Sequence, residues 1–225
     1  MRFRPTLSER GRHFITEIAI VVVGVLIALA AQQTVDSLNW RAQLREFREA
    51  VDVELAHDFA VLDHRRAQQP CVLRRIDELE RWLTSWRAGK PVALAGPIGR
   101  VPGMSLRTGI WSVRSDSLML HMPLRQRVAY SRAYDQLANV EQIRLDERSV
   151  WRDLADFDGA AELDAAAQMR LRGLLTRARN YAEVILLNAD GSLLVAQQMG
   201  ITPKLDAAVP PARSVICDPI MPAAR

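Results

Sequence analysis

The stretch EIAIVVVGVLIALAAQQ, residues 17 to 33, decides how this chain is organised. Fourteen apolar or small residues run without a charge from Ile18 to Ala31. Residues 14–35 form a stretch that, as an α-helix, measures about 33 Å and is long enough to cross the hydrocarbon core of a bilayer. We therefore expect a transmembrane helix over residues 14–35.

Positive charge gathers in front of this stretch and indicates its orientation. The residues that carry it are Arg2, Arg4, Arg10 and Arg12. Because basic residues beside a span remain on the cytoplasmic side, residues 1–13 are expected to form a cytoplasmic tail. The rest of the chain is then expected in the periplasm of a bacterium.

The apolar stretch has two interpretations, a retained signal anchor or a cleaved signal peptide. The small-x-small pattern Ala28-Leu29-Ala30 is typical of a cleavage site. Against cleavage, the chain holds neither Gly nor Pro from Val25 to Gln69, and apolar residues keep a helical spacing beyond the span. We favour a retained anchor that continues as helix to about Arg66, with cleavage after Ala30 as the alternative.

Four residues in or near the span are candidates for contacts with the membrane or a partner. Gly24 and Ala28 form a small-xxx-small pair that lets two helices approach, although chance explains such a pair in a Gly/Ala-containing span. Glu17 is either a partner contact or a charge at the end of the span. Trp40 is expected at the opposite interface. The expected partners are the lipid bilayer and, through the span, a membrane protein or a second copy.

The remaining sequence predicts an all-α protein, because no segment alternates with period two. Apolar residues at helical spacing predict helices over 36–66, 71–89, 123–157 and 161–187, and NADG at 188–191 predicts a turn before a last short helix. We expect the transmembrane helix to continue into an antiparallel bundle of about four main helices over residues 36–205, followed by an irregular Pro-rich tail over 206–225.

The two cysteines are Cys71, at the start of the second helix, and Cys217, in the tail. In an oxidising compartment a pair of cysteines suggests one disulfide, which would hold the tail on the bundle. Two free thiols, one buried and one exposed, are the alternative.

No motif predicts catalysis, a cofactor or a metal. Glu54-x-x-His57 has the spacing of a metal-binding pair within a helical bundle, but such sites need a second pair, which this sequence lacks. The basic residues comprise two lysines and 28 arginines, and the arginines are interleaved with acids. Nucleic-acid binding is not expected, because it needs an unbalanced basic face.

Two stretches resemble a group of uncharacterised bacterial single-pass membrane proteins. The first is EIAIVVVGVLIAL at 17–29, followed by Asn39-Trp40; the second is WSVRSDSLMLHMPLRQRVAYSRAY at 111–134. The chain departs from that pattern in the longer AAQQTVDSLNW segment and in SVRSDS, where the group has Ser-Gly. The resemblance implies a retained anchor and an outer helical domain, and it supplies no catalytic residues.

These observations favour a membrane-anchored periplasmic module for protein interaction, scaffolding or sensing. The alternative is a periplasmic small-ligand binder or enzyme, with a site between the bundle and the Gly/Pro-rich loop at 89–104. Convergent polar groups such as His57, His64 or His121 would favour that alternative.

Overall fold

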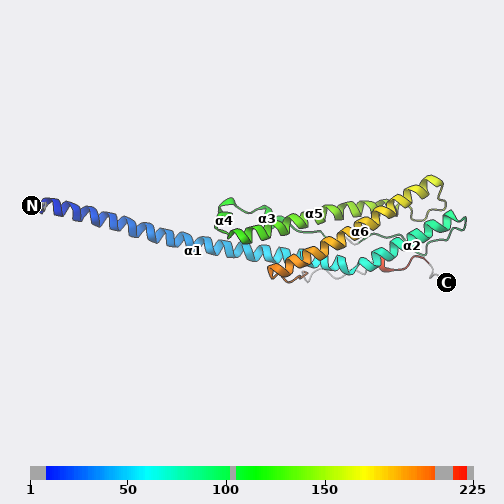
Figure 1. Ribbon diagram of the computed structural model, residues 1–225, viewed down its shortest axis with the longest axis horizontal. Helices are drawn as coiled ribbons and strands as arrows, with labels where there is room; N and C mark the ends of the chain where they lie inside the picture. The colour runs from blue at the N-terminus through cyan, green and yellow to red at the C-terminus, as the bar shows by residue number, and fades with distance from the viewer. Residues whose placement is uncertain (1–8, 102–104, 206–214, 222–225) are drawn as a thin grey trace, which may run out of the picture. The chain divides into compact units, whose positions relative to one another are not determined.

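The structure of the chain is a computed structural model that describes residues 9–101, 105–205 and 215–221 (Figure 1). Its elements are α1 (Glu9–Ala67), α2 (Gln69–Arg87), α3 (Gly109–Ser112), α4 (Asp116–His121), α5 (Leu124–Ala155), α6 (Ala165–Met199) and the 3-10 helix η1 (Val215–Cys217). No strand occurs among these described residues. The predicted all-α class is confirmed.

The chain divides into two compact units. The first consists of the chain up to Arg48 together with residues 115–122, which contain α4. The second consists of residues 49–114 and everything from Pro123 onward. Helix α1 contributes residues to both units, and its two parts differ sharply in composition.

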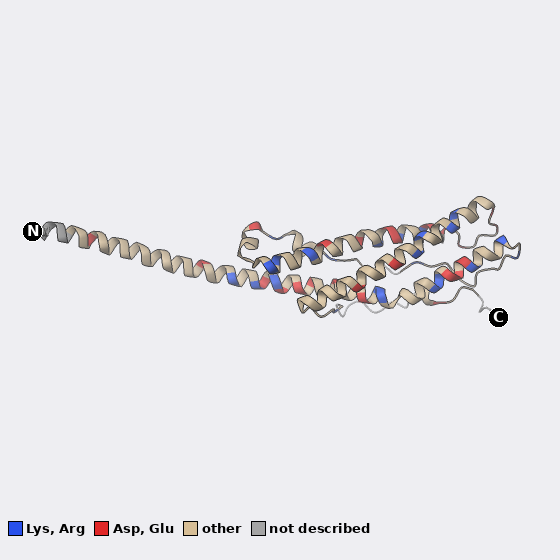
Figure 2. Ribbon diagram, viewed as in Figure 1, with Lys and Arg blue, Asp and Glu red and all other residues tan. Residues whose placement is uncertain are grey.

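The first unit is dominated by the apolar part of α1. From Phe14 on, this helix contains a window long and apolar enough to cross a membrane, and none of that window is buried. No residue from Ile18 to Val35 is charged, so Figure 2 draws this part of α1 as a continuous tan ribbon. The helix carries its apolar side chains on all sides, as lipid-facing helices do.

The second unit is a helical bundle with one main core. Helix α5 packs against α6, α6 packs against α2, and η1 packs against α2. The core is filled by Val72, Ile76, Leu79, Trp82, Ile98, Val150, Trp151, Leu154, Leu171, Leu175, Ala178, Ile216 and Ile220. Basic and acidic residues alternate along the helices of this unit in Figure 2. This balance matches the interleaved charges of the sequence.

Helix α2 follows α1 end to end and does not fold back on it (Figure 1). The reason is that Gln68 keeps a right-handed helical conformation, with φ −82° and ψ −10°. Pro70 lies in the first turn of α2, where its missing N–H costs no helical hydrogen bond. Helices α5 and α6 run in opposite directions, as expected for neighbours in a bundle.

The turn predicted at NADG is wrong. Helix α6 continues unbroken from Ala165 to Met199 and includes Gly191. Tertiary contacts compensate for the turn-forming residues. Asn188 donates to the carbonyl of Val184 within the helix at 2.8 Å, and Asp190 pairs with Arg66 of α1 at 3.5 Å. A Cβ at Gly191 would lie 3.2 Å from Gln136 of α5, so the glycine permits close helix packing.

The other helix boundaries follow ordinary capping chemistry. Asp164 caps α6 by accepting from the amide of Ala167 at 2.7 Å, so this helix begins four residues later than predicted. Gly200 ends it in the left-handed conformation. The helix predicted over 123–157 is confirmed as α5, and the short helices α3 and α4 precede it.

Candidate functional site

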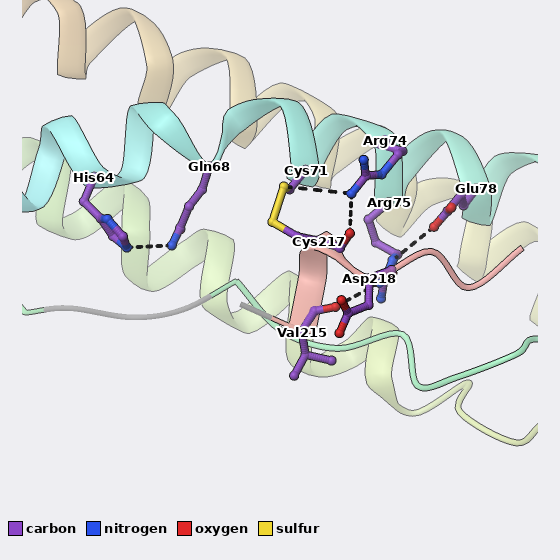
Figure 3. The surroundings of a disulfide bond; sticks show 9 residues. All are labelled: His64, Gln68, Cys71, Arg74, Arg75, Glu78, Val215, Cys217 and Asp218. Carbon is purple, nitrogen blue, oxygen red and sulfur yellow. Dashed lines mark hydrogen bonds and ion pairs between the residues drawn. A yellow bond between two sulfur atoms is a disulfide. The ribbon is translucent and has the colours of Figure 1, made fainter. Parts of the chain in front are cut away.

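A disulfide joins Cys71 at the start of α2 to Cys217 in η1 (Figure 3). The two Cα atoms are 4.8 Å apart, and 146 residues separate the cysteines in sequence. A cross-link that closes so long a loop restricts the unfolded chain and stabilises the fold by about 4 to 5 kcal/mol in the chain-entropy account. The described part of the tail is thereby held on the bundle.

Arg75, one turn after Cys71, ties the same tail to a second segment. Its side chain is fully buried. It donates to the carbonyls of Pro97 and Ile98 in the long loop, and to those of Val215 and Asp218 in the tail. Four carbonyl acceptors around one guanidinium make a rigid, charge-assisted junction.

The charge of Arg75 is balanced from within its own helix. Its Nε lies 3.3 Å from Oε2 of Glu78, which also accepts from the backbone amide of Ile220. Burial lowers the pKa of Arg75, and Glu78 opposes this shift. Arg74 donates to the carbonyl of Cys217 beside the disulfide (Figure 3). We name the disulfide, Arg74, Arg75 and Glu78 the tail clasp; its chemistry is structural.

A second polar cluster lies where α1 meets α5 within the second unit. Glu54 and Asp58, one helical turn apart on α1, are both buried. Glu54 accepts from the hydroxyl of Tyr134 at 2.7 Å and from the amide of Ile110. Asp58 accepts from the amide of Arg107 through Oδ1 at 2.9 Å. The two acids thus hold the segment around α3 against α1, and we call this group the acidic cluster.

The acidic cluster is poorly solvated, and this changes its protonation. Burial raises the pKa of Asp58 to about 7, helped by the charge of Glu54 and opposed by the amide of Arg107. Oδ2 of Asp58 has no hydrogen-bond partner among the described residues. Burial also raises the pKa of Tyr134, whose ring stacks on Trp111 with centroids 5.3 Å apart. At neutral pH, Asp58 is therefore poised between its two protonation states.

The histidines considered in the sequence have separate roles. His57 is buried on α1, and His64 shares a 2.9 Å hydrogen bond with the side chain of Gln68. His121 belongs to α4 in the first unit. Within the described ranges, no group of three or more His, Cys, Asp or Glu residues is arranged to hold a metal ion. Glu54 and His57 are both buried, and within the described ranges they belong to no such group.

The long loop borders a hollow of about 650 Å³. Trp82, Trp86, loop residues 91–97 and residues 158–161 line it. Trp82 donates its indole N–H to the carbonyl of Val92 at 3.0 Å, whereas the buried indole N–H of Trp86 has no acceptor in the part of the chain that the structure describes. Asp158 holds the loop by accepting from the amide of Ile98 at 2.6 Å. The wall of the hollow is mainly apolar.

The candidate residues of the span lie in the first unit. Glu17, Gly24 and Ala28 are exposed on α1, and nothing lies within 4 Å of a Cβ built on Gly24. Trp40 is half-buried and stacks on His121, with ring centroids 4.2 Å apart and planes 12° from parallel. The tryptophan expected at the membrane interface is thus held in place by α4.

Sequence reasoning missed Arg75, Asp58 and the stacked histidine. Arg75 is one of two adjacent arginines on an amphipathic helix, and only its position on the apolar side of α2, between Val72 and Ile76, distinguishes it from Arg74. Asp58 likewise falls among Leu55, Phe59 and Leu62 in the apolar spacing of α1. A charged residue on the buried face of a helix was the available signal.

Comparison with known proteins gives no assignment. No protein family matches the chain, and no match is found among curated proteins or solved structures.

Proposed function

We propose that this chain is a membrane-anchored helical module of the bacterial inner membrane that acts through protein interaction, scaffolding or sensing. The observation that carries the proposal is the apolar window of α1, none of which is buried within the protein. An apolar core helix of a water-soluble protein would be covered by its own chain. Lipid is the medium that matches a helix with apolar side chains on every side.

The orientation rests on two independent features. Four arginines precede the span, and basic flanks remain in the cytoplasm. The disulfide between Cys71 and Cys217 suits the oxidising periplasm, where such bonds persist. Both features favour a short cytoplasmic tail and a periplasmic helical domain.

A non-enzymatic role is supported by how the polar residues of the second unit are used. The tail clasp and most contacts of the acidic cluster satisfy backbone groups and hold segments together. The bundle core is filled with Leu, Ile, Val and Trp side chains. Such an arrangement builds a stable surface for partners.

The proposal is tested by the topology of the full chain in bacterial cells. We expect alkaline phosphatase fused after Arg225 to be active, because that enzyme folds only where its disulfides form. We expect the corresponding β-galactosidase fusion to be inactive. The reverse pattern would contradict the orientation and, with it, the periplasmic module.

The partner is tested by cross-linking through the span. A photoreactive residue at Ala28 is expected to give an adduct of defined mass in intact membranes, either with a second copy or with another membrane protein. Ile27 lies about 100° away around the helix and is the matched control position. A monomer alone at both positions would contradict interaction through the Gly24/Ala28 face.

A periplasmic small-ligand binder is the second candidate, and the hollow beside the long loop favours it. The buried indole N–H of Trp86 has no acceptor among the described residues, so a small molecule whose carbonyl or carboxylate reaches it would gain a hydrogen bond. Soaking the purified chain with such small acids should quench indole fluorescence, and Trp86→Phe should remove that response. Identical quenching in the variant would exclude this site.

A further inference from the structure

A hollow with polar and apolar walls lies on the first unit, where the apolar part of α1 ends. Its volume is about 410 Å³, and it is formed by one face of α1 together with His121 of α4. The polar residues of that face are Gln33, Asp36, Ser37 and Arg41, and Leu44 adds an apolar side chain. Gln33, Ser37 and Arg41 recur every fourth residue and Asp36 lies three residues after Gln33, so these residues lie toward one side of the helix. The stacked rings of Trp40 and His121 also line it.

The depth of this hollow follows from the span, so the inference rests on the proposed membrane anchor. Val35 closes the apolar stretch, and Arg41 lies six residues later, or about 9 Å further along the helix axis. The head-group layer on each side of a bilayer is about 5 to 7 Å thick. A helix that crosses the hydrocarbon core over residues 14–35 therefore places the hollow from the end of the core, at Gln33, to the outer side of this layer, at Arg41.

Two oppositely charged side chains line the hollow. Asp36 and Arg41 are exposed, and neither forms an ion pair with any residue that the structure describes. The His121 ring is fixed, because its Nδ1 donates to the carbonyl of Ser117 at 2.8 Å while its face packs on Trp40. A rigid aromatic wall beside one free cation and one free anion is a preorganised polar site.

We propose that this hollow binds the head group of a zwitterionic phospholipid of the phosphatidylethanolamine class. The guanidinium of Arg41 takes the phosphate, for which its planar donor pattern is suited. The carboxylate of Asp36 accepts hydrogen bonds from the primary ammonium group. Gln33 and Ser37 supply neutral hydrogen-bonding groups between them. One bound lipid would then fix α4 against α1 at the membrane surface.

The experiment measures lipid retained by the full chain after extraction in mild detergent. Native mass spectrometry is performed with added phosphatidylethanolamine or with added phosphatidylglycerol. Phosphatidylglycerol has a phosphate but no ammonium group. We expect Arg41→Gln to lower phosphatidylethanolamine retention about five-fold. Arg45→Gln, one turn further along and outside the hollow, removes the same charge and should leave retention unchanged.

Asp36→Asn separates the two halves of the site. This variant should lose the preference for phosphatidylethanolamine over phosphatidylglycerol, whereas the unmodified chain should show it. Equal retention of both lipids by the unmodified chain, or equal loss in Arg41→Gln and Arg45→Gln, would overturn the site. All variants are also extracted with alkaline carbonate. An unmodified chain that stays in the membrane pellet but shows no lipid preference refutes the site alone, whereas loss of the unmodified chain from the pellet refutes the anchor.

Discussion

Apolar side chains are exposed in the first part of α1 and buried in the second part. From Phe14 to Leu38 the apolar residues are exposed; Val25, at the centre of the expected span, is 52% exposed. After Arg48 the apolar residues Val51, Leu55 and Leu62 are completely buried. Charged residues of this later part, such as Asp58 and Arg65, are buried with them.

This difference separates a part of the helix that the protein covers from a part that it leaves uncovered. In the later part, every buried apolar side chain has protein neighbours, and buried charges have partners such as the 2.6 Å pair of Arg65 with Glu147. In the earlier part, apolar side chains surround the helix and lack any such cover. One helix therefore combines a segment stabilised by protein packing with a segment long and apolar enough to cross a membrane.

The largest difference between the two parts of α1 is expected when an arginine is placed in each of them. Val25→Arg should remove most of the protein from the membrane fraction, because an arginine at the centre of a span costs about 2.5 to 3.5 kcal/mol on insertion scales. Val53→Arg, at a valine that is 66% exposed in the second unit, should leave both membrane retention and the unfolding midpoint unchanged. The measurement is the fraction of each variant in the membrane pellet.

An equal fraction of Val25→Arg and Val53→Arg in the membrane pellet would contradict the difference between the two parts of α1. If Val25→Arg stays in the pellet, the segment around it is not surrounded by lipid. If Val53→Arg is lost or unfolded, the exposed face of the later part carries a contact of its own.

Buried charge in the later part gives the next largest effect. Arg65→Met should lower the free energy of unfolding by about 3 to 5 kcal/mol, since it leaves Glu147 buried without its cation. Arg66→Met is the adjacent control; Arg66 is about half exposed and pairs with Asp63 and Asp190, so its loss should cost less than about 1 kcal/mol. Chemical denaturation of the full chain in detergent micelles measures both.

The double variant Arg65→Met/Glu147→Leu sharpens this result. Because it removes both buried charges, it should recover most of the stability that Arg65→Met loses. A double variant less stable than Arg65→Met would show that Glu147 stabilises the bundle through other contacts.

Asp58 gives a smaller effect that depends on pH. Its pKa rises from 3.8 in the unfolded chain to about 7 in the fold, so the folded state binds the extra proton between these values. Its contribution to stability is therefore full below about pH 4 and is lost as the pH rises toward 7. Asp58→Asn keeps the oxygen that accepts from Arg107 and removes the charge.

The stability that the variant gains over the unmodified chain should be about 2 to 3 kcal/mol larger at pH 8 than at pH 5. The gain should shrink steadily as the pH falls to 5. Denaturation of both proteins at pH 5, 6, 7 and 8 measures the difference. A constant difference across this range would show that Asp58 does not titrate with a raised pKa.

Periodicity alone predicted the long helices. Helix α5 was expected over 123–157, and the absence of Gly and Pro from Val25 to Gln69 predicted an unbroken α1. Local signals failed where tertiary packing is stronger, as at Gly191, which allows α6 to lie close to Gln136. Helical spacing does not indicate whether the chain reverses direction between two helices. The end-to-end course of α1 and α2 depends on the helical conformation of Gln68.

Less of the candidate site than of the fold could be predicted from the sequence. Cysteine count alone favoured the pair Cys71 and Cys217, because two cysteines in an oxidising compartment leave one pairing. The partners of Arg75 are backbone carbonyls, which any sequence supplies, so no pattern indicates them. The stack of Trp40 on His121 joins residues 81 positions apart, and only the folded chain brings them together.

The central claim is that the apolar part of α1 is retained as a membrane anchor. The most direct measurement is the mass and membrane partition of the full chain, tagged at its C-terminus and expressed in a bacterium. The account predicts a full-length product that stays in the pellet after extraction with alkaline carbonate. A product that lacks the residues up to Ala30 and is free in the periplasm would contradict it, and EIAIVVVGVLIALAAQQ would then be part of a cleaved signal peptide.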